Sequence, residues 1–342
     1  MTARHAAFSL LLLSACTPEK VPPEEEIPPP DYSAPGAWRA ASAEVEIVGS
    51  TGVTLPVQIW YPTMDELEGN KIRYDDLLDG EAIADGSPDC PAPGPLVAFS
   101  HGSGGMRWQS PFFGEHLASH GWVVVAPDHT GNTFLDDSGS IEEIALRRPQ
   151  DLADAVDWLF SENGAGGSYE GCVDAAAGYA VVGHSFGGYT TYAAAGAEVD
   201  WNGDMVDLSD PRVWAGVAWA PWDVGGAIVE GAASISVPMA TLGGTLDDTT
   251  IWSTQLALYN ALTVAPRALG EFPTAGHYSF SPVACTLAGL KGDGCGDAFI
   301  DLDLFVDLVN TSTLSFLAGA NGDAAALEQL PDSPELLWTV VE

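Results

Sequence analysis

The chain has 342 residues, of which 48 are acidic and 11 are basic, and its formal net charge is −37 at pH 7. Nucleic acids and anionic membrane surfaces are bound through basic patches, so this charge argues against both as partners. The length allows one large hydrophobic core, and nothing suggests two independent catalytic domains. The diffuse negative charge fits an uncharged or cationic substrate, but it more readily indicates a surface that keeps the protein soluble, as in salty surroundings.

The N-terminus begins with a short apolar segment that is typical of an export signal. Residues 6–13 form a largely apolar run that follows Arg4 and His5, and they are too few to span a bilayer. Small residues precede Cys16, in a pattern that resembles the lipobox of bacterial lipoproteins, where the cysteine becomes lipidated. We therefore expect a signal peptide over residues 1–15 and a lipid anchor on Cys16. The alternative is an ordinary signal peptide with an incidental cysteine.

The segment after Cys16 has the composition of a tether. Residues 17–36 hold seven prolines and a run of three glutamates, a composition that cannot pack into a core. We expect an extended tether over residues 16–37, a catalytic domain over residues 38–320 and a tail over residues 321–342. Together with the anchor, this organisation predicts an exported protein held on the bacterial cell envelope, at either the inner or the outer membrane.

An opening β-hairpin is predicted where the folded part begins. Apolar and polar residues alternate at 44–48 and 54–61, and a turn at residues 49–52 separates the two runs. A polar stretch, rich in glycine and proline, then follows to residue 94.

Strands and helices alternate through the rest of the chain. Apolar runs typical of strands lie at residues 96–100, 122–126, 178–183, 213–219 and 237–243, with a weaker one at 267–272. Helical patterns lie at residues 112–120, 149–160, 186–197, 251–262 and 299–317. This alternation predicts an α/β fold with a mostly parallel central sheet and helices on both faces. The connection over residues 220–236 is too short for a large lid domain, so we expect an open site.

One serine lies in a glycine-bounded turn between a predicted strand and a predicted helix. The turn reads Gly183-His-Ser-Phe-Gly-Gly188 and places Ser185 at its tip. In this context G-x-S-x-G is the nucleophile elbow of the α/β-hydrolase fold, in which the turn is strained and side chains larger than hydrogen clash. We therefore predict that Ser185 is a nucleophile. The alternative is an inert turn serine, a role that asparagine or glycine would fill equally well.

A serine nucleophile needs a base and an acid that orients it. In α/β-hydrolases the chain order is Ser, acid, His, with each residue on a loop after a strand. Asp247 follows the predicted strand that ends at residue 243, and His277 follows the last predicted strand, so we expect these two as acid and base. Asp248 and Asp223 remain alternatives for the acid, and a plain surface histidine is the alternative for His277.

An oxyanion hole needs two backbone N–H groups, and the sequence offers a candidate for each. The residue after the nucleophile, Phe186, supplies one. Ser103 is expected to supply the other, because glycines surround it in the loop after the 96–100 strand and let the backbone approach a substrate. Trp108 and Trp222 are candidates for the walls of a substrate pocket, although most tryptophans pack in cores.

Apart from Cys16, the chain holds four cysteines, which allow three pairings in an oxidising compartment. Cys90 precedes the 96–100 strand and Cys172 precedes the 178–183 strand, and these two strands should be neighbours in an α/β-hydrolase sheet. We therefore favour Cys90–Cys172 and Cys285–Cys295. The spacing matches no zinc site, and the expected chemistry needs no metal or cofactor.

Several segments together resemble the platelet-activating-factor acetylhydrolase and predicted dienelactone hydrolase group. They are residues 101–106, 117–121, 148–151, 157–159 and 183–188, within a resemblance that runs roughly from residue 57 to residue 317. The resemblance implies the same roles for Ser185, His277, Ser103 and Phe186.

The acid departs from that resemblance. In the acetylhydrolase itself the acid follows the preceding strand, where this chain has Ala220. The acid at Asp247 is similar to that of bacterial cutinase-like polyester hydrolases, and Ala220-Pro-Trp-Asp223 resembles a segment of those enzymes that places a substrate-contacting tryptophan. Dienelactone hydrolases proper use a cysteine nucleophile, so that activity is not expected here.

These features predict a serine carboxylic-ester hydrolase that acts through an acyl-enzyme on short-chain, lipid or polyester esters. One alternative is a catalytically silent surface protein that uses this fold for binding, and the intact set of Ser185, Asp247 and His277 argues against it. A serine peptidase is another alternative, and it lacks an obvious domain for gating peptides.

Overall fold

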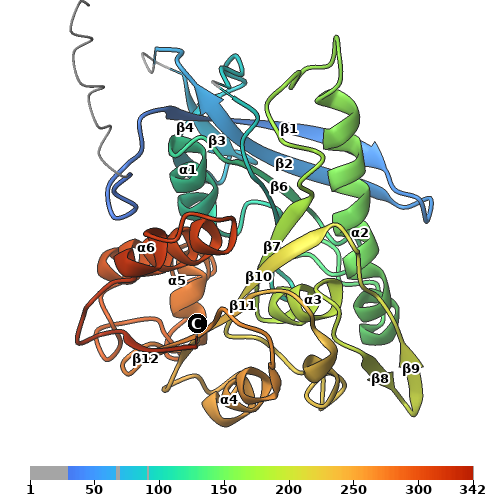
Figure 1. Ribbon diagram of the computed structural model, residues 1–342, viewed down its shortest axis with the longest axis vertical. Helices are drawn as coiled ribbons and strands as arrows, with labels where there is room; N and C mark the ends of the chain where they lie inside the picture. The colour runs from blue at the N-terminus through green and yellow to red at the C-terminus, as the bar shows by residue number, and fades with distance from the viewer. Residues whose placement is uncertain (1–29, 67–69, 91, 342) are drawn as a thin grey trace, which may run out of the picture. The chain divides into compact units, whose positions relative to one another are not determined.

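The chain folds around an 11-stranded sheet in the computed structural model, which describes residues 30–66, 70–90 and 92–341. The order across the sheet is β13-β12-β11-β10-β7-β5-β6-β2-β1-β4-β3 (Figure 1). The central strands run parallel to one another: β12 (Arg267–Phe272), β11 (Met239–Gly244), β10 (Val213–Trp219), β7 (Tyr179–His184), β5 (Leu96–Ser100) and β6 (Val123–Pro127). The expected signal peptide, Cys16 and most of the expected tether lie outside the described residues.

The outer strands complete the sheet on both sides. The predicted hairpin is present as the antiparallel pair β1 (Arg39–Val48) and β2 (Thr54–Thr63). Two short strands, β3 (Lys71–Tyr74) and β4 (Leu78–Ala84), lie where the sequence showed only a polar stretch. Sequence patterns miss them because charged side chains interrupt the alternation in both, and because β3, at the edge of the sheet, has only four residues. At the other edge β13 (Leu337–Val341) pairs antiparallel with β12.

Helices cover both faces of the sheet, and each face has its own hydrophobic core. On one face lie α2 (Ile141–Glu162), α3 (Phe186–Ala194) and α4 (Trp252–Ala261). On the other lie α1 (Pro111–Ser119) and α6 (Leu302–Ala320), which appear together on the left in Figure 1. The predicted α/β architecture, with a mostly parallel sheet covered on both sides, is confirmed.

Shorter elements occupy the connections. They are the strands β8 (Val199–Trp201) and β9 (Asp204–Val206), which form a separate hairpin, the helix α5 (Pro282–Thr286), and the 3-10 helices η1 (Gly231–Ser234), η2 (His277–Phe280) and η3 (Ala326–Gln329). Between residues 220 and 236 the only helix is η1, a single short turn.

Helix α2 begins well before the boundary that the sequence predicts. The sequence pattern predicts a start at Pro149, and proline is common in the first turn of a helix. Instead α2 starts after Ser140, whose hydroxyl accepts the Glu143 N–H, and Pro149 lies inside it. Proline cannot donate to the carbonyl of Ala145 four residues earlier. The hydroxyl of Tyr189 lies 3.3 Å from that oxygen and donates to it, so the carbonyl stays paired.

The packed domain extends past both of the boundaries expected at residues 38 and 320. Tyr32 is buried, and its hydroxyl donates to Asp323 Oδ2 at 2.9 Å. Ala326 is buried as well, and β13 lies beyond it in the sheet. Residues 31–37 and 321–341 therefore belong to the folded unit.

Two disulfides close loops in the chain. Cys90–Cys172 joins the approaches to β5 and β7, which are neighbouring strands, and Cys285–Cys295 closes a short loop after η2. These are the pairings that the sequence favours. Disulfides persist in oxidising compartments, so this pair fits an exported protein.

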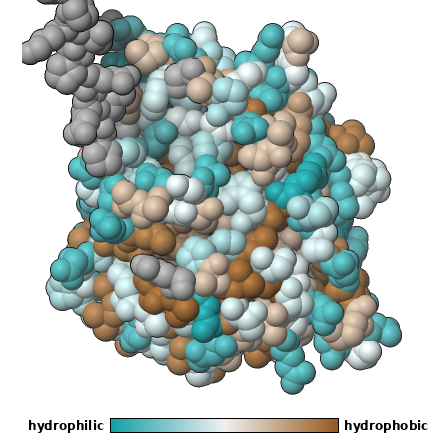
Figure 2. Space-filling view, in the orientation of Figure 1, coloured by the Kyte–Doolittle hydropathy of each residue, from teal (hydrophilic) through white to brown (hydrophobic). Residues whose placement is uncertain are grey.

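The surface mixes polar and apolar residues. On the face drawn in Figure 2, hydrophobic residues form patches separated by hydrophilic ones. Within the part of the chain that the structure describes, no helix combines the length and the apolar character needed to cross a membrane.

Candidate active site

The serine turn has the geometry that its sequence predicts. Ser185 connects β7 to α3 with a φ of +59°, a conformation that residues other than glycine rarely adopt. The flanking glycines are required by space. A Cβ on Gly187 would lie 1.9 Å from the carbonyl oxygen of Ser100, and one on Gly183 would lie 2.3 Å from the carbonyl oxygen of Gly187. The turn therefore presents Ser185 at the carboxyl edge of the sheet.

A histidine and a carboxylate meet at the same edge. His277 Nδ1 lies 2.9 Å from Asp247 Oδ2, and both side chains are buried. Because the carboxylate can only accept, the proton of the neutral imidazole resides on Nδ1. This leaves the lone pair on Nε2, which is the arrangement that a general base requires.

The other two acid candidates have different surroundings. Asp248 is exposed, and its backbone N–H, rather than its carboxylate, contacts a neighbour. The carboxylate of Asp223 accepts the N–H of Gly225 within a turn. Only Asp247, of the three, contacts His277 among the described residues.

Further groups hold the Asp247 carboxylate in place. Its Oδ1 accepts the backbone N–H groups of Thr249 and Thr250 at 2.9 and 2.6 Å. Its Oδ2 accepts Gln255 Nε2 of α4 at 3.0 Å as well as His277. Sequence reasoning missed Gln255, because a single glutamine within a helix carries no catalytic pattern.

A second histidine connects the serine turn to His277. The ring of His184 lies 4.6 Å from that of His277, and its Nε2 donates to the His277 carbonyl at 3.2 Å. Its Nδ1 accepts Gln109 Nε2 at 3.1 Å. Burial, together with the neighbouring His277, holds the pKa of His184 well below its usual 6.5, so its ring is neutral. His184 thus ties the residue before Ser185 to the backbone of the candidate base.

The loop after β5 lies directly against the serine turn. A Cβ on Gly102 would come within 3.4 Å of the Ser185 Cβ. The N–H of Gly102 donates to Gln109 Oε1 at 2.9 Å, and the amide of Ser103 follows it in this loop. Phe186 is the first residue of α3, where the backbone N–H groups have no partner within the helix. The two amides predicted as an oxyanion hole therefore flank Ser185.

The family follows from comparison with known proteins. The PET hydrolase-like family matches residues 97–303, which is more than half of the chain. The chain belongs to this family. Its fold is therefore the predicted α/β-hydrolase fold, and the cutinase-like features of the sequence are confirmed.

The alignments with individual curated relatives cover a smaller share of the chain than the family match does. Over 185 residues the chain is 29% identical to Cutinase est1 of Thermobifida alba, covering 54% of this chain and 53% of the relative. It is 29% identical to Cutinase 2 of Thermobifida cellulosilytica, over 54% of this chain and 60% of the relative. For Cutinase cut1 of Thermobifida fusca the identity is again 29%, over 54% of this chain and 49% of the relative. The chain spans about half the length of these curated relatives.

The two tryptophans expected as pocket walls differ in their exposure. Trp222 is partly exposed, and its backbone N–H donates to the Ser185 carbonyl at 3.0 Å. Its ring packs edge-on against the ring of Phe186. Trp108 is only 1% exposed, and its indole donates to Asp75 at 2.7 Å. The expectation for Trp108 is corrected, because this side chain fills the core instead of facing a cleft.

A second Ser–His–Asp arrangement lies behind the first. Ser100 Oγ is 2.8 Å from His129 Nε2, and His129 Nδ1 is 2.9 Å from Asp151 Oδ2. All three residues are fully buried, so no substrate reaches Ser100. Burial lowers the pKa of His129 well below 6.5, with help from the nearby Arg148. This second set is therefore a structural hydrogen-bond network.

A carboxylate outside the predicted set joins the loops of the acid and the base. Asp293 Oδ1 accepts the N–H groups of His277 and Asp248 at 2.9 and 3.0 Å, and its Oδ2 accepts the Thr249 hydroxyl at 2.6 Å. It lies inside the loop that Cys285–Cys295 closes. Sequence reasoning missed Asp293, since its role depends on contacts with residues as far as 45 positions away.

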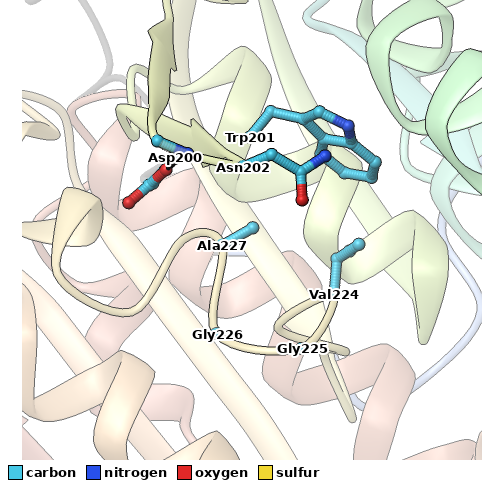
Figure 3. A pocket seen from close by; sticks show the side chains of 8 residues that line it. Asp200, Trp201, Asn202, Val224, Gly225, Gly226 and Ala227 are labelled. Atoms are coloured by element: carbon cyan, nitrogen blue, oxygen red, sulfur yellow. Dashed lines mark hydrogen bonds between the residues drawn. The ribbon is translucent and has the colours of Figure 1, made fainter.

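A shallow depression of about 320 Å³ lies elsewhere, between the β8–β9 hairpin and the loop after Trp222 (Figure 3). Its lining comprises Asp200, Trp201, Asn202, Gly203, Val224, Gly225, Gly226 and Ala227. None of the proposed catalytic residues lines it. In the described ranges no three His, Cys, Asp or Glu side chains are grouped as metal ligands.

Proposed function

We propose that this protein is a serine carboxylic-ester hydrolase that works through an acyl-enzyme. The observation that carries the proposal is the Asp247–His277 hydrogen bond at the sheet edge where a strained turn presents Ser185. Membership of the PET hydrolase-like family and similarity to proteins named cutinases support the same reaction class.

In the proposed reaction Ser185 Oγ attacks the ester carbonyl while His277 Nε2 takes its proton. Asp247 stabilises the imidazolium that forms, and the amides of Ser103 and Phe186 donate to the developing oxyanion. The proton then passes from His277 to the departing alkoxide, which leaves as the alcohol. Water, activated by His277, hydrolyses the ester that remains on Ser185, and the acid product and free enzyme are released.

The loops around this site support an uncharged, apolar ester as substrate. After β6, Phe134 and Leu135 are 64% and 80% exposed, next to the loop that carries Ser103. Leu246 and Ile251, on the loop of Asp247, are 43% and 53% exposed. Exposed apolar groups at a site favour an apolar ligand, and a net charge of −37 disfavours anionic ones. Polyesters and neutral lipid esters satisfy both conditions.

Hydrolysis of p-nitrophenyl esters of graded chain length tests the proposal. We expect turnover by the wild type and a loss of kcat on the order of 10⁶-fold in Ser185→Ala, because the nucleophile is removed. Ser209→Ala is the matched control, since Ser209 is an exposed serine in another loop, and it should retain full activity. Absence of turnover by the wild type at every chain length would contradict the hydrolase proposal and favour a silent binding protein.

Product release from an insoluble polyester film, compared with release from emulsified neutral lipid, distinguishes the two substrate classes. We expect soluble acids from the polyester film, in line with the family. Activity on the lipid alone would move the substrate toward the acetylhydrolase-like alternative.

We also propose that the protein is anchored through a lipid on Cys16, which lies outside the described residues. The lipobox-like pattern before this cysteine supports the anchor. Cys16→Ser should move the protein from the membrane fraction to the soluble fraction. Unchanged fractionation would contradict lipidation.

A further inference from the structure

A cation is completely buried beneath the loop after β5. Arg148 of α2 is 0% exposed, its Nη1 donates to the His101 carbonyl at 2.6 Å, and its Nη2 donates to the Gly102 carbonyl at 3.2 Å. Burying a guanidinium is costly unless its N–H groups are paired, and an apolar side chain would fill the same volume at lower cost. Packing alone therefore does not explain an arginine at this position.

The bond from Arg148 to the Gly102 carbonyl contributes to the direction in which the Ser103 amide points. In a trans peptide the C=O and the N–H point in opposite directions, and the Gly102–Ser103 peptide is trans. Its carbonyl accepts from three donors: Arg148, His101 Nδ1 at 2.7 Å, and the Gly105 N–H of the same loop at 3.1 Å. Arg148 and His101 are buried, so the carbonyl points into the protein. The Ser103 N–H must then point outward, toward the side where Ser103 is exposed.

The same guanidinium also restrains the Ser103 side chain. Arg148 Nη2 donates to Asn132 Oδ1 at 2.7 Å, and Asn132 Nδ2 donates to Ser103 Oγ at 3.1 Å. Asn132 is itself buried. Ser103 is thus held through its preceding carbonyl and through its hydroxyl.

Arg148 contacts the second amide donor as well. Its Cζ lies 4.3 Å from the centre of the Phe186 ring, within the range of a cation–π interaction. Phe186 supplies the other N–H of the proposed oxyanion hole. Burial lowers the pKa of Arg148 to about 9 while the nearby Asp151 raises it, so the guanidinium is charged at neutral pH.

We propose that Arg148 is the positioning residue of the oxyanion hole, which it orients by binding the Gly102–Ser103 peptide and the Phe186 ring from the interior. The inference rests on the proposed ester hydrolysis. Arg148 is fully buried, so it does not touch the substrate and acts on the reaction through the two amides. Its loss therefore weakens interactions made in the transition state, which lowers kcat and leaves KM unchanged.

The test uses the purified full chain with Arg148→Met and Arg148→Lys. With a soluble p-nitrophenyl ester, we expect Arg148→Met to lose about 100-fold in kcat at constant KM, comparable to removal of one oxyanion donor. Phenylboronic acid, whose tetrahedral adduct on Ser185 carries a negative oxygen, should bind more weakly by a similar factor. Arg148→Lys keeps the charge but not the planar guanidinium, so its kcat should lie between those of the wild type and Arg148→Met.

Arg212→Met is the matched control. Arg212 pairs with Asp210 at 2.6 Å and precedes β10, at the sheet edge opposite the proposed site. We expect its kcat and boronate affinity to equal those of the wild type. If Arg148→Met does not fold, as judged by circular dichroism, Arg148→Lys and Asn132→Ala test the inference instead. Asn132→Ala removes the side chain that connects Arg148 to Ser103 Oγ and leaves the bonds of Arg148 to the His101 and Gly102 carbonyls.

The outcomes separate the two proposals. A wild type without ester turnover overturns the proposed function. An active wild type whose folded Arg148 variants keep their kcat and boronate affinity overturns the role of Arg148 alone, as does a loss that appears only in KM. For Asn132→Ala we expect a kcat loss of several-fold with a matching loss of boronate affinity, and an unchanged kcat there counts against the inference.

Discussion

The two sides of the proposed active site are held by different kinds of groups. On the oxyanion side, Arg148 is a fully buried cation that binds carbonyls and an aromatic ring. On the acid–base side, Asp293 is a half-buried carboxylate that accepts from the loops of Asp247 and His277, in a segment closed by a disulfide.

The difference follows from where each loop lies. The loop after β5 packs against α2, so interior hydrogen bonds and packing suffice to hold it. On the acid–base side Asp247 and His277 are buried, but Asp248 and Thr249 are exposed and Asp293 is half-buried, so water competes for their hydrogen bonds and weakens charge interactions. There a covalent bond adds restraint that burial does not supply. The acid–base side should therefore respond to pH and to reduction, while the oxyanion side should respond to core substitutions.

The largest effect is expected for the acid. Asp247→Asn should lower kcat by about 10⁴-fold, because an amide at this position favours the wrong tautomer of His277. Asp248→Asn is the matched control and should remain active. The reverse pattern, with Asp248→Asn inactive and Asp247→Asn active, would identify Asp248 as the acid and contradict the assignment of Asp247. Both variants are compared by kcat on one soluble ester.

A smaller loss is expected for the carboxylate that joins the two loops. Asp293→Ala removes three hydrogen bonds but no reacting group, and we expect kcat to fall by roughly 10-fold, in line with small misplacements of catalytic groups. Asp297→Ala, an exposed aspartate in the same region, should have no effect. Equal activity of Asp293→Ala and the wild type would show that the disulfide loop does not position the site.

The two disulfides should separate stability from activity. Replacing Cys90 and Cys172 by serine opens the longer loop, with a sequence separation of 82, and should cost about 4–5 kcal/mol of stability with kcat unchanged.

Replacing Cys285 and Cys295 by serine opens a loop with a separation of only 10 and should cost about 2–3 kcal/mol. Because this loop carries Asp293, kcat should also fall a few-fold. Urea denaturation and ester kinetics measure both quantities, and a kcat loss confined to the first pair would contradict the comparison.

The smallest effect concerns pH. Burial opposes ionisation of Asp293, but the donors on His277, Thr249 and Asp248 outweigh it, so its pKa lies below the ordinary 3.8. A lowered pKa in the folded state means that this carboxylate stabilises the fold above pH 3.8 and that its contribution is lost as the pH falls through the folded value. The difference in unfolding free energy between wild type and Asp293→Asn should therefore be constant from pH 5 to 7 and shrink below about pH 3.8. A difference that grows on acidification would have the wrong sign.

Much of the site was accessible from local patterns. The turn around Ser185 is recognisable because Gly183 and Gly187 leave no room for a Cβ, and that restriction acts within a few residues. The positions of Asp247 and His277 follow from strand order, since parallel strands end at one edge. The pairing of Cys90 with Cys172 follows from the same neighbour relation between β5 and β7.

Other features depended on tertiary contacts. Trp108 and Trp222 are both close in sequence to site loops, yet only Trp222 is partly exposed. Helix α2 runs through Pro149 because the Tyr189 hydroxyl, from another helix, pairs the freed carbonyl. The periodicity of a helical segment gives no information about a hydrogen-bond donor that lies 44 residues further along the chain.

The sequence by itself determined the fold class, the serine turn and the order of acid and base, because each depends on short-range sterics or on strand succession. Only the tertiary structure decided which aspartate contacts His277, and only it brought Arg148 beneath Gly102 and Asp293 between the two loops. The physical reason is that a hydrogen bond requires a donor–acceptor distance correct to within a fraction of an ångström and an N–H or O–H group that points at the acceptor. Long-range packing sets these quantities, and no local pattern in the chain encodes them.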